Sequence, residues 1–445
     1  MPCYQWETSL KPSESATWIP LTLQGSEEDL FYVKRAKDEF LYDKEDTAFI
    51  DAISSWWTSI HGHCHPQIQA AIEKQIQHLD HVMLAGFLHD PVEKLSESLL
   101  SLTNHSFQKV FYSDNGSNAV EIALKLAIQY FKNADQNSQK NGFFIFSSAY
   151  HGDSIGAMNV SGLNYFNRIF SSLRFPTKEF QAPNCINCPL QKTPNSCNVE
   201  CLDPFAEFLP TNSESFAAVI IEPLVFGANG MIFYEPKFLE RLQTLCKTHD
   251  ILLIYDEVFT GMGRLGNGFA YQETQTCPDL LVTAKGLTGG ALPLAATLVS
   301  HSIYQRFLNK DPYLSFFHAH TMTGNPISCS ASLASVGLWK DGGKKRVKQL
   351  ESNLKEIKSE LVSLFPDLVL HARVKGSLFA FDLPMEIGED EYLNPVGKRF
   401  KEKAFQKQVL LRPLGNTIYV CPPYTTSKQS LLQIQEALAF ALKSL

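Results

Sequence analysis

Short apolar runs recur along the chain between residues 110 and 299, and segments of helical periodicity separate several of them. The runs lie at residues 110–113, 142–146, 216–222, 251–255, 280–282 and 295–299. Helical patterns lie between some of these runs, for example near 120–128 and at 238–248. Continuous apolar strands that alternate with amphipathic helices are typical of a parallel sheet covered on both faces. We therefore expect an α/β fold whose ligands bind outside the carboxyl ends of the strands.

The pattern changes after about residue 335. A long charged helix is predicted at 344–364, and strands follow at 376–382, 409–412 and 417–420 before a closing helix. This order indicates a smaller α+β lobe, which the N-terminal segment is expected to join. We therefore divide the chain into three parts. Residues 1–60 contribute to the small lobe and the active site, residues 61–335 form the large domain, and residues 336–445 form the small domain.

The composition excludes several classes of protein. Lys and Arg number 39 against 46 Asp and Glu, a net charge of −7. A general nucleic-acid binder is therefore not expected, because phosphate neutralisation needs concentrated positive charge. No apolar run is long enough to span a membrane, and the N-terminus lacks a basic region followed by an apolar stretch. The ten cysteines are then most simply reduced thiols, which predicts a cytoplasmic location.

A lysine and an aspartate carry the first chemical signal. Lys285 lies in a mostly apolar turn followed by glycines, and Asp256 ends the apolar run before it. Such a lysine can lose its proton and attack a carbonyl, and a carboxylate at the mouth of a buried strand can hold a pyridinium. Together they predict a Schiff base between Lys285 and pyridoxal 5′-phosphate (PLP), an electron sink for amino-group chemistry. Lys285 would act as nucleophile and then as general acid and base.

Other segments offer groups that could surround such a cofactor. Gly116 and Ser117 lie between a predicted strand and helix, where backbone N–H groups and a hydroxyl can hold a phosphate. Tyr150 follows a predicted strand and could stack on the pyridine ring. Val258 points to the same side of an extended chain as Asp256 and could pack on the ring as well. Thr321, in a polar loop, could donate to a phosphate.

Several charged and histidine side chains elsewhere have more than one possible role. Arg412 precedes a rigid turn and could bind a carboxylate through paired hydrogen bonds, although a surface salt bridge is the commoner fate of an arginine. Glu222 ends a predicted strand and could orient a neighbour or serve only the structure. His318 and His320 could suggest a metal, but no carboxylate accompanies them, and we interpret their loop as lying near the cofactor.

Four cysteines form two closely spaced pairs in a segment rich in proline and asparagine. The pairs are Cys185 with Cys188 and Cys197 with Cys201. These spacings are compatible with a structural zinc ion, which would leave no open position for chemistry. The gap between the pairs is shorter than in the commonest zinc patterns. A surface excursion with unpaired thiols is the alternative.

The assembled residues resemble the class III PLP-dependent aminotransferases of fold type I. The resemblance runs from about Trp18 to Tyr424, and its most specific stretch is residues 251–266, with Lys285 placed 29 residues after Asp256. It implies a large domain with a mostly parallel central sheet flanked by helices, and a smaller α+β lobe. It also implies PLP as the cofactor and a homodimer with shared active sites.

Within this class, the chain is similar to the branch that acts in biotin biosynthesis. The similarity rests on Trp56 and Trp57 ahead of residues 61–66, and on the runs 81–89, 150–158 and 412–419. That branch converts 8-amino-7-oxononanoate to 7,8-diaminononanoate, with S-adenosylmethionine as the usual amino donor and lysine in some members. The alternatives are a class III enzyme acting on a different amino and keto pair, and a non-catalytic or zinc-binding scaffold that keeps the fold.

The resemblance also implies a role for each matching residue. The catalytic residues would be Lys285, Asp256 and Tyr150. The cofactor would be bound by Gly116, Ser117, Tyr150, Asp256, Val258, Lys285, His320 and Thr321. In the resemblance, Thr321 reaches the phosphate of the partner subunit. The substrate would be bound by Trp56, Trp57, Tyr150, Asp153, Arg264, Lys285, Ala319, Arg412 and Tyr419. Leu21 stands where the branch often has a tyrosine, so the sequence leaves the amino donor open.

Overall fold

The computed structural model describes residues 10–147, 149–162, 167–193, 195–385 and 394–445. Its largest element is a seven-stranded sheet in the order β4-β12-β11-β10-β7-β5-β6. β12 runs antiparallel to both of its neighbours, and all the other pairs are parallel. The expected mostly parallel sheet is therefore confirmed. The strands are β4 (Lys109–Ser113), β5 (Gly142–Phe146), β6 (Thr177–Phe180), β7 (Phe216–Ile221), β10 (Leu252–Asp256), β11 (Leu280–Thr283) and β12 (Ala295–Val299).

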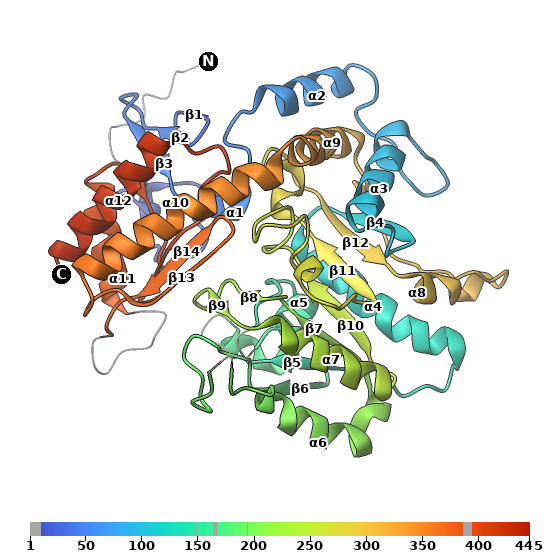
Figure 1. Cartoon of the computed structure of the whole chain (residues 1–445). Helices are drawn as coiled ribbons and strands as arrows, with labels where there is room; N and C mark the ends of the chain where they lie inside the picture. The colour runs from blue at the N-terminus through green and yellow to red at the C-terminus, as the bar shows by residue number, and fades with distance from the viewer. Residues whose placement is uncertain (1–9, 148, 163–166, 194, 386–393) are drawn as a thin grey trace.

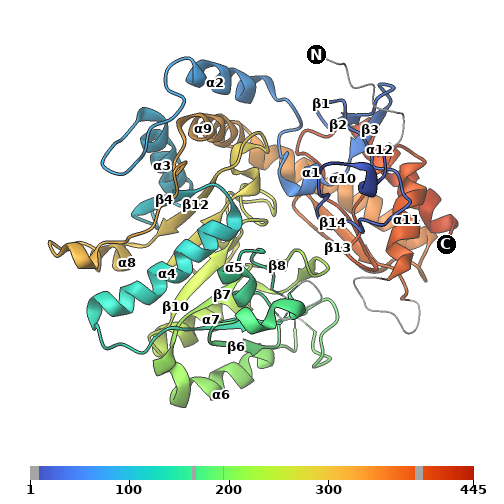
Figure 2. The same cartoon turned by 180° about the vertical axis from the view of Figure 1, so that it is seen from behind.

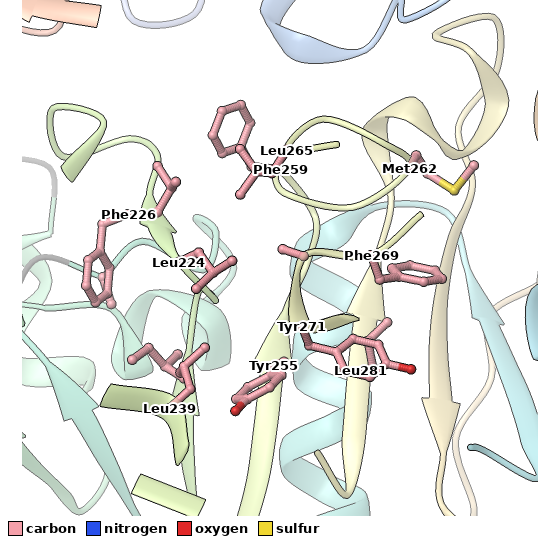
Figure 3. Packing of buried hydrophobic residues seen from close by; sticks show 14 of the residues in the cluster. Leu224, Phe226, Leu239, Tyr255, Phe259, Met262, Leu265, Phe269, Tyr271 and Leu281 are labelled. Carbon is pink, nitrogen blue, oxygen red and sulfur yellow. The ribbon is translucent and has the colours of Figure 1, made fainter. Parts of the chain in front are cut away.

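Helices cover both faces of this sheet (Figures 1 and 2). Successive side chains of a strand point to opposite faces, so Leu252 and Ile254 of β10 pack with α4, while Leu253 and Tyr255 pack with α7. Figure 3 shows the second of these layers, where Tyr255 lies near Leu239 of α7. The helices of this part are α2 (Pro66–Ile76), α3 (Asp90–Leu102), α4 (Gly116–Ala134), α5 (Ile155–Val160), α6 (Asp203–Asn212), α7 (Pro236–Thr248), α8 (His301–Gln305) and α9 (Pro326–Lys340).

A smaller lobe combines the two ends of the chain. One sheet has the order β1-β2-β3-β15 and another the order β13-β14-β16. Its strands are β1 (Arg35–Lys37), β2 (Phe40–Tyr42), β3 (Ala48–Asp51), β13 (Leu370–Lys375), β14 (Leu378–Asp382), β15 (Val409–Leu410) and β16 (Thr417–Val420). Its helices are α10 (Gly343–Leu364), α11 (Pro395–Phe405) and α12 (Lys428–Lys443). In both views β1–β3 lie in this lobe, although they come from the N-terminal segment. α10 connects the lobe to α9 next to the large sheet.

The pairing of β3 with β15 supports the division of the chain. Ile50 lies opposite Val409 in a parallel register, so the N-terminal segment and the C-terminal segment share a sheet. Ile50 is also fully buried in the separate apolar cluster of this lobe. We propose domain boundaries near residues 60 and 335. No helix in the described part of the chain is both long and apolar enough to cross a membrane.

Several elements were not predicted from the pattern of apolar positions. The edge strand β6 reads Thr-Lys-Glu-Phe, and its two charged residues are exposed, which hides the strand in the sequence. α9 is buried on most of its surface because it packs against α2 and α3, so it lacks the polar face that marks an amphipathic helix. The short hairpin of β8 (Val225–Phe226) and β9 (Ile232–Phe233) was also missed.

Two leucines of α10 test the separate core of the smaller lobe. Leu361 is fully buried, whereas Leu364, one turn later, is 57% exposed. Leu361→Ala is expected to lower the free energy of unfolding by about 2–5 kcal/mol because it opens a cavity. Leu364→Ala is expected to change it by less than about 0.5 kcal/mol. Urea denaturation of both variants measures the difference, and equal losses would contradict the packing described here.

Candidate active site

Functional side chains from four strands meet in one pocket at the carboxyl ends of the sheet. Asp256 ends β10, Lys285 begins a short 3-10 turn after β11, Tyr150 follows β5 and Glu222 follows β7. All four line the same cavity, which has a volume of about 430 Å³. Parallel strands present their carboxyl ends at one edge of a sheet, which is where such folds bind ligands. The topology therefore brings together residues that lie far apart in the sequence.

Lys285 occupies a strained and enclosed position. Its φ of 45° lies in the left-handed region, which is unfavourable for a residue with a Cβ atom. Its Nζ atom lies 4.3 Å from the ring centroid of Trp57 and 6.0 Å from that of Phe259. Burial lowers the pKa of the amine to about 8, against the opposing effect of the Asp256 and Glu222 carboxylates. A substantial part of the amine is therefore neutral near physiological pH.

A buried histidine holds Asp256. The Nδ1 atom of His151 lies 2.7 Å from Asp256 Oδ2, and the backbone N–H of Val258 donates to Asp256 Oδ1 at 2.9 Å. Within the described residues the Nε2 atom of His151 is buried and has no partner. The proton of a neutral imidazole therefore belongs on Nδ1, where it donates to the carboxylate. The sequence pattern carried no sign of this contact, because His151 stood out only as part of the run that begins at Tyr150.

The opposite end of the pocket can hold a phosphate. α4 begins at Gly116, and the Asn115 side chain caps it by accepting from the N–H of Asn118 at 2.9 Å. A Cβ atom on Gly116 would lie 3.0 Å from both methyl groups of Val258. A Cβ atom on Gly152, whose φ is +130°, would lie 2.0 Å from Ser117 Oγ. These close approaches leave the backbone N–H groups and the Ser117 hydroxyl at a helix N-terminus, which favours an anion.

The residues present fit PLP. The cavity has an anion-binding helix end at Gly116 and Ser117, an amine at Lys285 and a carboxylate at Asp256. Val258 lies between Asp256 and Gly116, so it can pack on a flat ring that joins the two ends. This arrangement agrees with the cofactor assignment made from the sequence.

Glu222 and Tyr150 are coupled through the backbone. Glu222 accepts from the N–H of Tyr150 at 3.1 Å and from the N–H of Gly227 at 2.9 Å. Burial raises the pKa of this carboxyl to about 7, and the His151 and backbone contacts oppose that rise. Burial also raises the pKa of the Tyr150 phenol, with a further effect from the Asp153 carboxylate. Glu222 thus holds the backbone of the segment that carries Tyr150.

The two tryptophans lie on a left-handed turn. Residues Ser54–Trp57 (α1) all have positive φ, between 43° and 76°. Such a conformation costs roughly 1–2 kcal/mol for each residue other than glycine. Trp57 is 4% exposed, and its Nε1–H donates to Tyr419 Oη at 3.1 Å. Trp56 is 40% exposed, and the guanidinium carbon of Arg412 lies 4.4 Å from its ring centroid.

Some of the predicted substrate residues lie away from the pocket wall. Arg264 is buried behind the wall, where its guanidinium donates to the Trp57 carbonyl at 2.8 Å and to Ser377 Oγ at 3.1 Å. Arg264 therefore does not line the cavity itself. Asp153 is exposed next to Tyr150. Tyr419 is buried and does not line the cavity, but its hydroxyl accepts a hydrogen bond from Trp57, which does.

The loop at residues 318–323 does not complete the pocket of its own chain. Ala319 and Thr321 are exposed and do not line the cavity. His320 comes nearer, because its Nε2 atom lies 3.9 Å from Oδ1 of Asp114, which does line the cavity. The loop therefore lies at the rim of the cavity, and Ala319 and Thr321 do not reach the cavity of their own chain.

The two cysteine pairs lie close enough for their thiols to interact. No group of three or more His, Cys, Asp or Glu residues is arranged to hold a metal ion in the part of the chain that the structure describes. Cys185 is exposed, and burial together with the neighbouring thiols raises the pKa of Cys201 to about 11.

Comparison with known proteins agrees with this geometry. The family model described as aminotransferase class-III matches residues 23–442. The chain is 39% identical over 429 residues to the adenosylmethionine-8-amino-7-oxononanoate aminotransferase of Synechococcus elongatus, covering 96% of this chain and 98% of the relative. It is 35% identical over 439 residues to the protein of that name from Geobacter sulfurreducens, covering 97% and 96%.

The fold of this chain closely resembles those of several solved structures. The adenosylmethionine-8-amino-7-oxononanoate aminotransferase of Methanocaldococcus jannaschii superposes with a TM-score of 0.88 at 31% identity, covering 96% of this chain and 97% of that one. An amine transaminase from an uncultivated Pseudomonas species, solved in its PLP-bound form, superposes with a TM-score of 0.91 at 28% identity, covering 98% and 100%. From its sequence and from its fold, the chain belongs to the class III aminotransferase family.

Proposed function

We propose that this enzyme aminates 8-amino-7-oxononanoate to 7,8-diaminononanoate in biotin biosynthesis, with PLP as its cofactor. Relatives that carry the corresponding name cover nearly the whole chain at more than 30% identity, which supports the choice of substrate. The observation that carries the chemistry is the single pocket that holds Lys285, Asp256 and the N-terminus of α4. An amine, a carboxylate and an anion-binding helix end are the groups that PLP chemistry requires of a protein.

PLP, when bound, supplies a carbonyl carbon that accepts amines and a ring that withdraws electrons. The Lys285 amine would supply the nucleophile and would later carry protons as a general acid and base. Asp256, which is fixed by His151 and by the N–H of Val258, would pair with the pyridine nitrogen. Tyr150, whose backbone N–H donates to Glu222, lines the pocket and would stack on the cofactor ring.

The acceptor has an apolar chain and a terminal carboxylate, and the tryptophan turn matches both features. Trp57 offers an apolar surface at the pocket wall, beside Phe259 at 4.5 Å between ring centroids. Arg412, above Trp56, can bind the carboxylate through paired hydrogen bonds. The proposed amino donor is S-adenosylmethionine, and lysine is the alternative. The alternative stays open because Leu21 is exposed and cannot supply the hydroxyl of the tyrosine common in this branch.

We also propose that the enzyme is a homodimer with shared active sites. Ala319 and Thr321 are exposed at the rim of their own pocket, which leaves them available to the pocket of a second copy. Neighbouring apolar side chains are exposed as well, among them Phe317 and Met322, as an interface would require. A cytoplasmic location completes the proposal. It agrees with the nine cysteines in the described ranges, all of which are free thiols.

The reaction itself is tested with purified holoenzyme. Incubated with 8-amino-7-oxononanoate and S-adenosylmethionine, lysine or glutamate in turn, the enzyme is expected to form 7,8-diaminononanoate with at least one donor, detected by mass spectrometry. Lys285→Ala is expected to abolish turnover because it removes the nucleophile. Lys94→Ala, which removes an exposed lysine far from the pocket, serves as the control. No product with any donor, or turnover by Lys285→Ala, would refute the proposal.

The lowered pKa of Lys285 predicts a specific pH dependence. The neutral amine is the reactive form, so its acetylation in the apoenzyme is expected to accelerate as pH rises, with a midpoint near the pKa of about 8. Below that pH the amine gains a proton and becomes unreactive. The ion pair with Glu28 raises the pKa of the exposed Lys398, so acetylation of Lys398 in the same sample is expected to accelerate at higher pH. Mass spectrometry of the two acetylated peptides measures both rates, and coincident midpoints would contradict the assignment.

Mixed dimers test the shared site. A chain with Lys285→Ala is combined with a chain that carries Thr321→Ala, each of which alone is expected to have little activity. If Thr321 serves the partner's pocket, one of the two sites in the mixed dimer contains both wild-type residues. Turnover is then expected to recover in the mixture. If Thr321 serves its own pocket, every site stays defective and no recovery occurs. Size-exclusion chromatography with light scattering checks that dimers form.

A further inference from the structure

A buried carboxylate anchors the left-handed turn that carries the two tryptophans. Asp51 ends β3 and is almost fully buried. Its Oδ2 atom accepts from Ser55 Oγ at 2.8 Å and lies 2.8 Å from His63 Nε2, while its Oδ1 atom accepts from the N–H of Ile53 at 3.2 Å. The His63 side chain is 13% exposed. Asp51, Ser55 and His63 thus form one network, which we call the turn anchor.

The turn needs such an anchor because its backbone conformation is unfavourable. Consecutive side chains on a helical turn diverge by about 100°, and the hand of the turn decides to which side each one goes. In the left-handed turn, Trp57 reaches Lys285 and Tyr419, while Trp56 reaches Arg412. A turn that relaxed to negative φ would redirect both indoles. The turn anchor acts at Ser55, directly before Trp56.

Trp56 in turn contacts the Arg412 guanidinium. The guanidinium carbon lies 4.4 Å from the indole centroid, within range of a cation–π interaction. No carboxylate in the described ranges lies within ion-pair distance of Arg412. The guanidinium therefore keeps its hydrogen-bond donors for an external anion. Its position depends on the ring beneath it, and that ring depends on the turn.

We propose that Asp51, Ser55 and His63 are positioning residues that give the enzyme its preference for an acceptor with a carboxylate at the end of an apolar chain. None of the three side chains lines the cavity. They hold the left-handed turn, which presents Trp56 to Arg412 and so places the guanidinium at the carboxylate-binding end. This inference rests on the proposed function for the identity of the acceptor, but the physical chain from anchor to guanidinium can be tested without turnover.

Two probes of equal length separate recognition of the carboxylate from general binding. Nonanoate carries the carboxylate, and nonanamide is its neutral counterpart. Isothermal titration calorimetry of the holoenzyme is expected to give tighter binding of nonanoate, by about tenfold, since a charge-assisted hydrogen bond is lost with the amide. Arg412→Ala is expected to bring the affinity ratio near one. His63→Ala and Ser55→Gly are expected to lower the ratio most of the way to that value.

Matched controls exclude a general loss of structure. Ser55→Gly removes the hydroxyl but tolerates the positive φ of 43° at this position, so the variant folds even if His63→Ala does not. His65→Ala alters a histidine of the same segment that caps α2 and lies outside the anchor. It is expected to keep the wild-type ratio. A purely structural defect would weaken both probes equally and leave the ratio unchanged.

The possible outcomes decide the inference separately from the proposed function. A wild-type ratio in His63→Ala and Ser55→Gly overturns the inference, as does a ratio near one in the wild type or an equal loss in His65→Ala. Turnover of 8-amino-7-oxononanoate by the wild type is measured in parallel. If turnover is absent while the anchor variants lose the ratio, the positioning role stands and only the identity of the acceptor is refuted.

Discussion

The pairing of β10 with β11 is the constraint on which the active site depends. The two strands run parallel with Asp256 opposite Val282, so they deliver their last residues to the same edge of the sheet. Lys285 follows three residues after Val282, and its amine therefore enters the pocket that Asp256 lines. Burial lowers the pKa of the amine, and the nearby carboxylates limit the change to a value of about 8. The amine is thus reactive near neutral pH and still able to carry a proton.

Two segments of strained backbone lie at this pocket. Lys285 has a positive φ, and so have all residues of the turn Ser54–Trp57. Unfavourable backbone conformations of this kind persist only where surrounding contacts determine them, and they are typical of functional sites. Here the contacts are polar and buried. The Arg264 guanidinium binds the Trp57 carbonyl, and Ser54 Oγ donates to the carbonyl of Cys421 at 2.7 Å. These buried contacts thereby stabilise the turn that places Trp57 at the pocket.

The two lobes supply different ends of the site. The large sheet provides the groups that suit the cofactor, namely Asp256, Lys285 and the start of α4. The segments next to the smaller lobe provide the tryptophan turn and Arg412, which suit an acceptor chain with a carboxylate. β3 leads directly into the turn and pairs with β15, which leads directly to Arg412. One short parallel pair therefore brings the tryptophan turn and Arg412 together, although they lie about 350 residues apart in the sequence.

The amino-acid sequence by itself determined the buried strands, the amphipathic helices and the reactive pair Lys285 and Asp256, because alternating and continuous apolar runs are local signals. It could not reveal β6, since an edge strand with exposed charges has no such signal. Only the tertiary structure showed that His151 contacts Asp256 and that Arg264 binds the carbonyl of Trp57 from behind the pocket wall. Those assignments depend on contacts between segments distant in the chain and on the hand of a strained turn. Local patterns carry no information about either, so three-dimensional packing decided them.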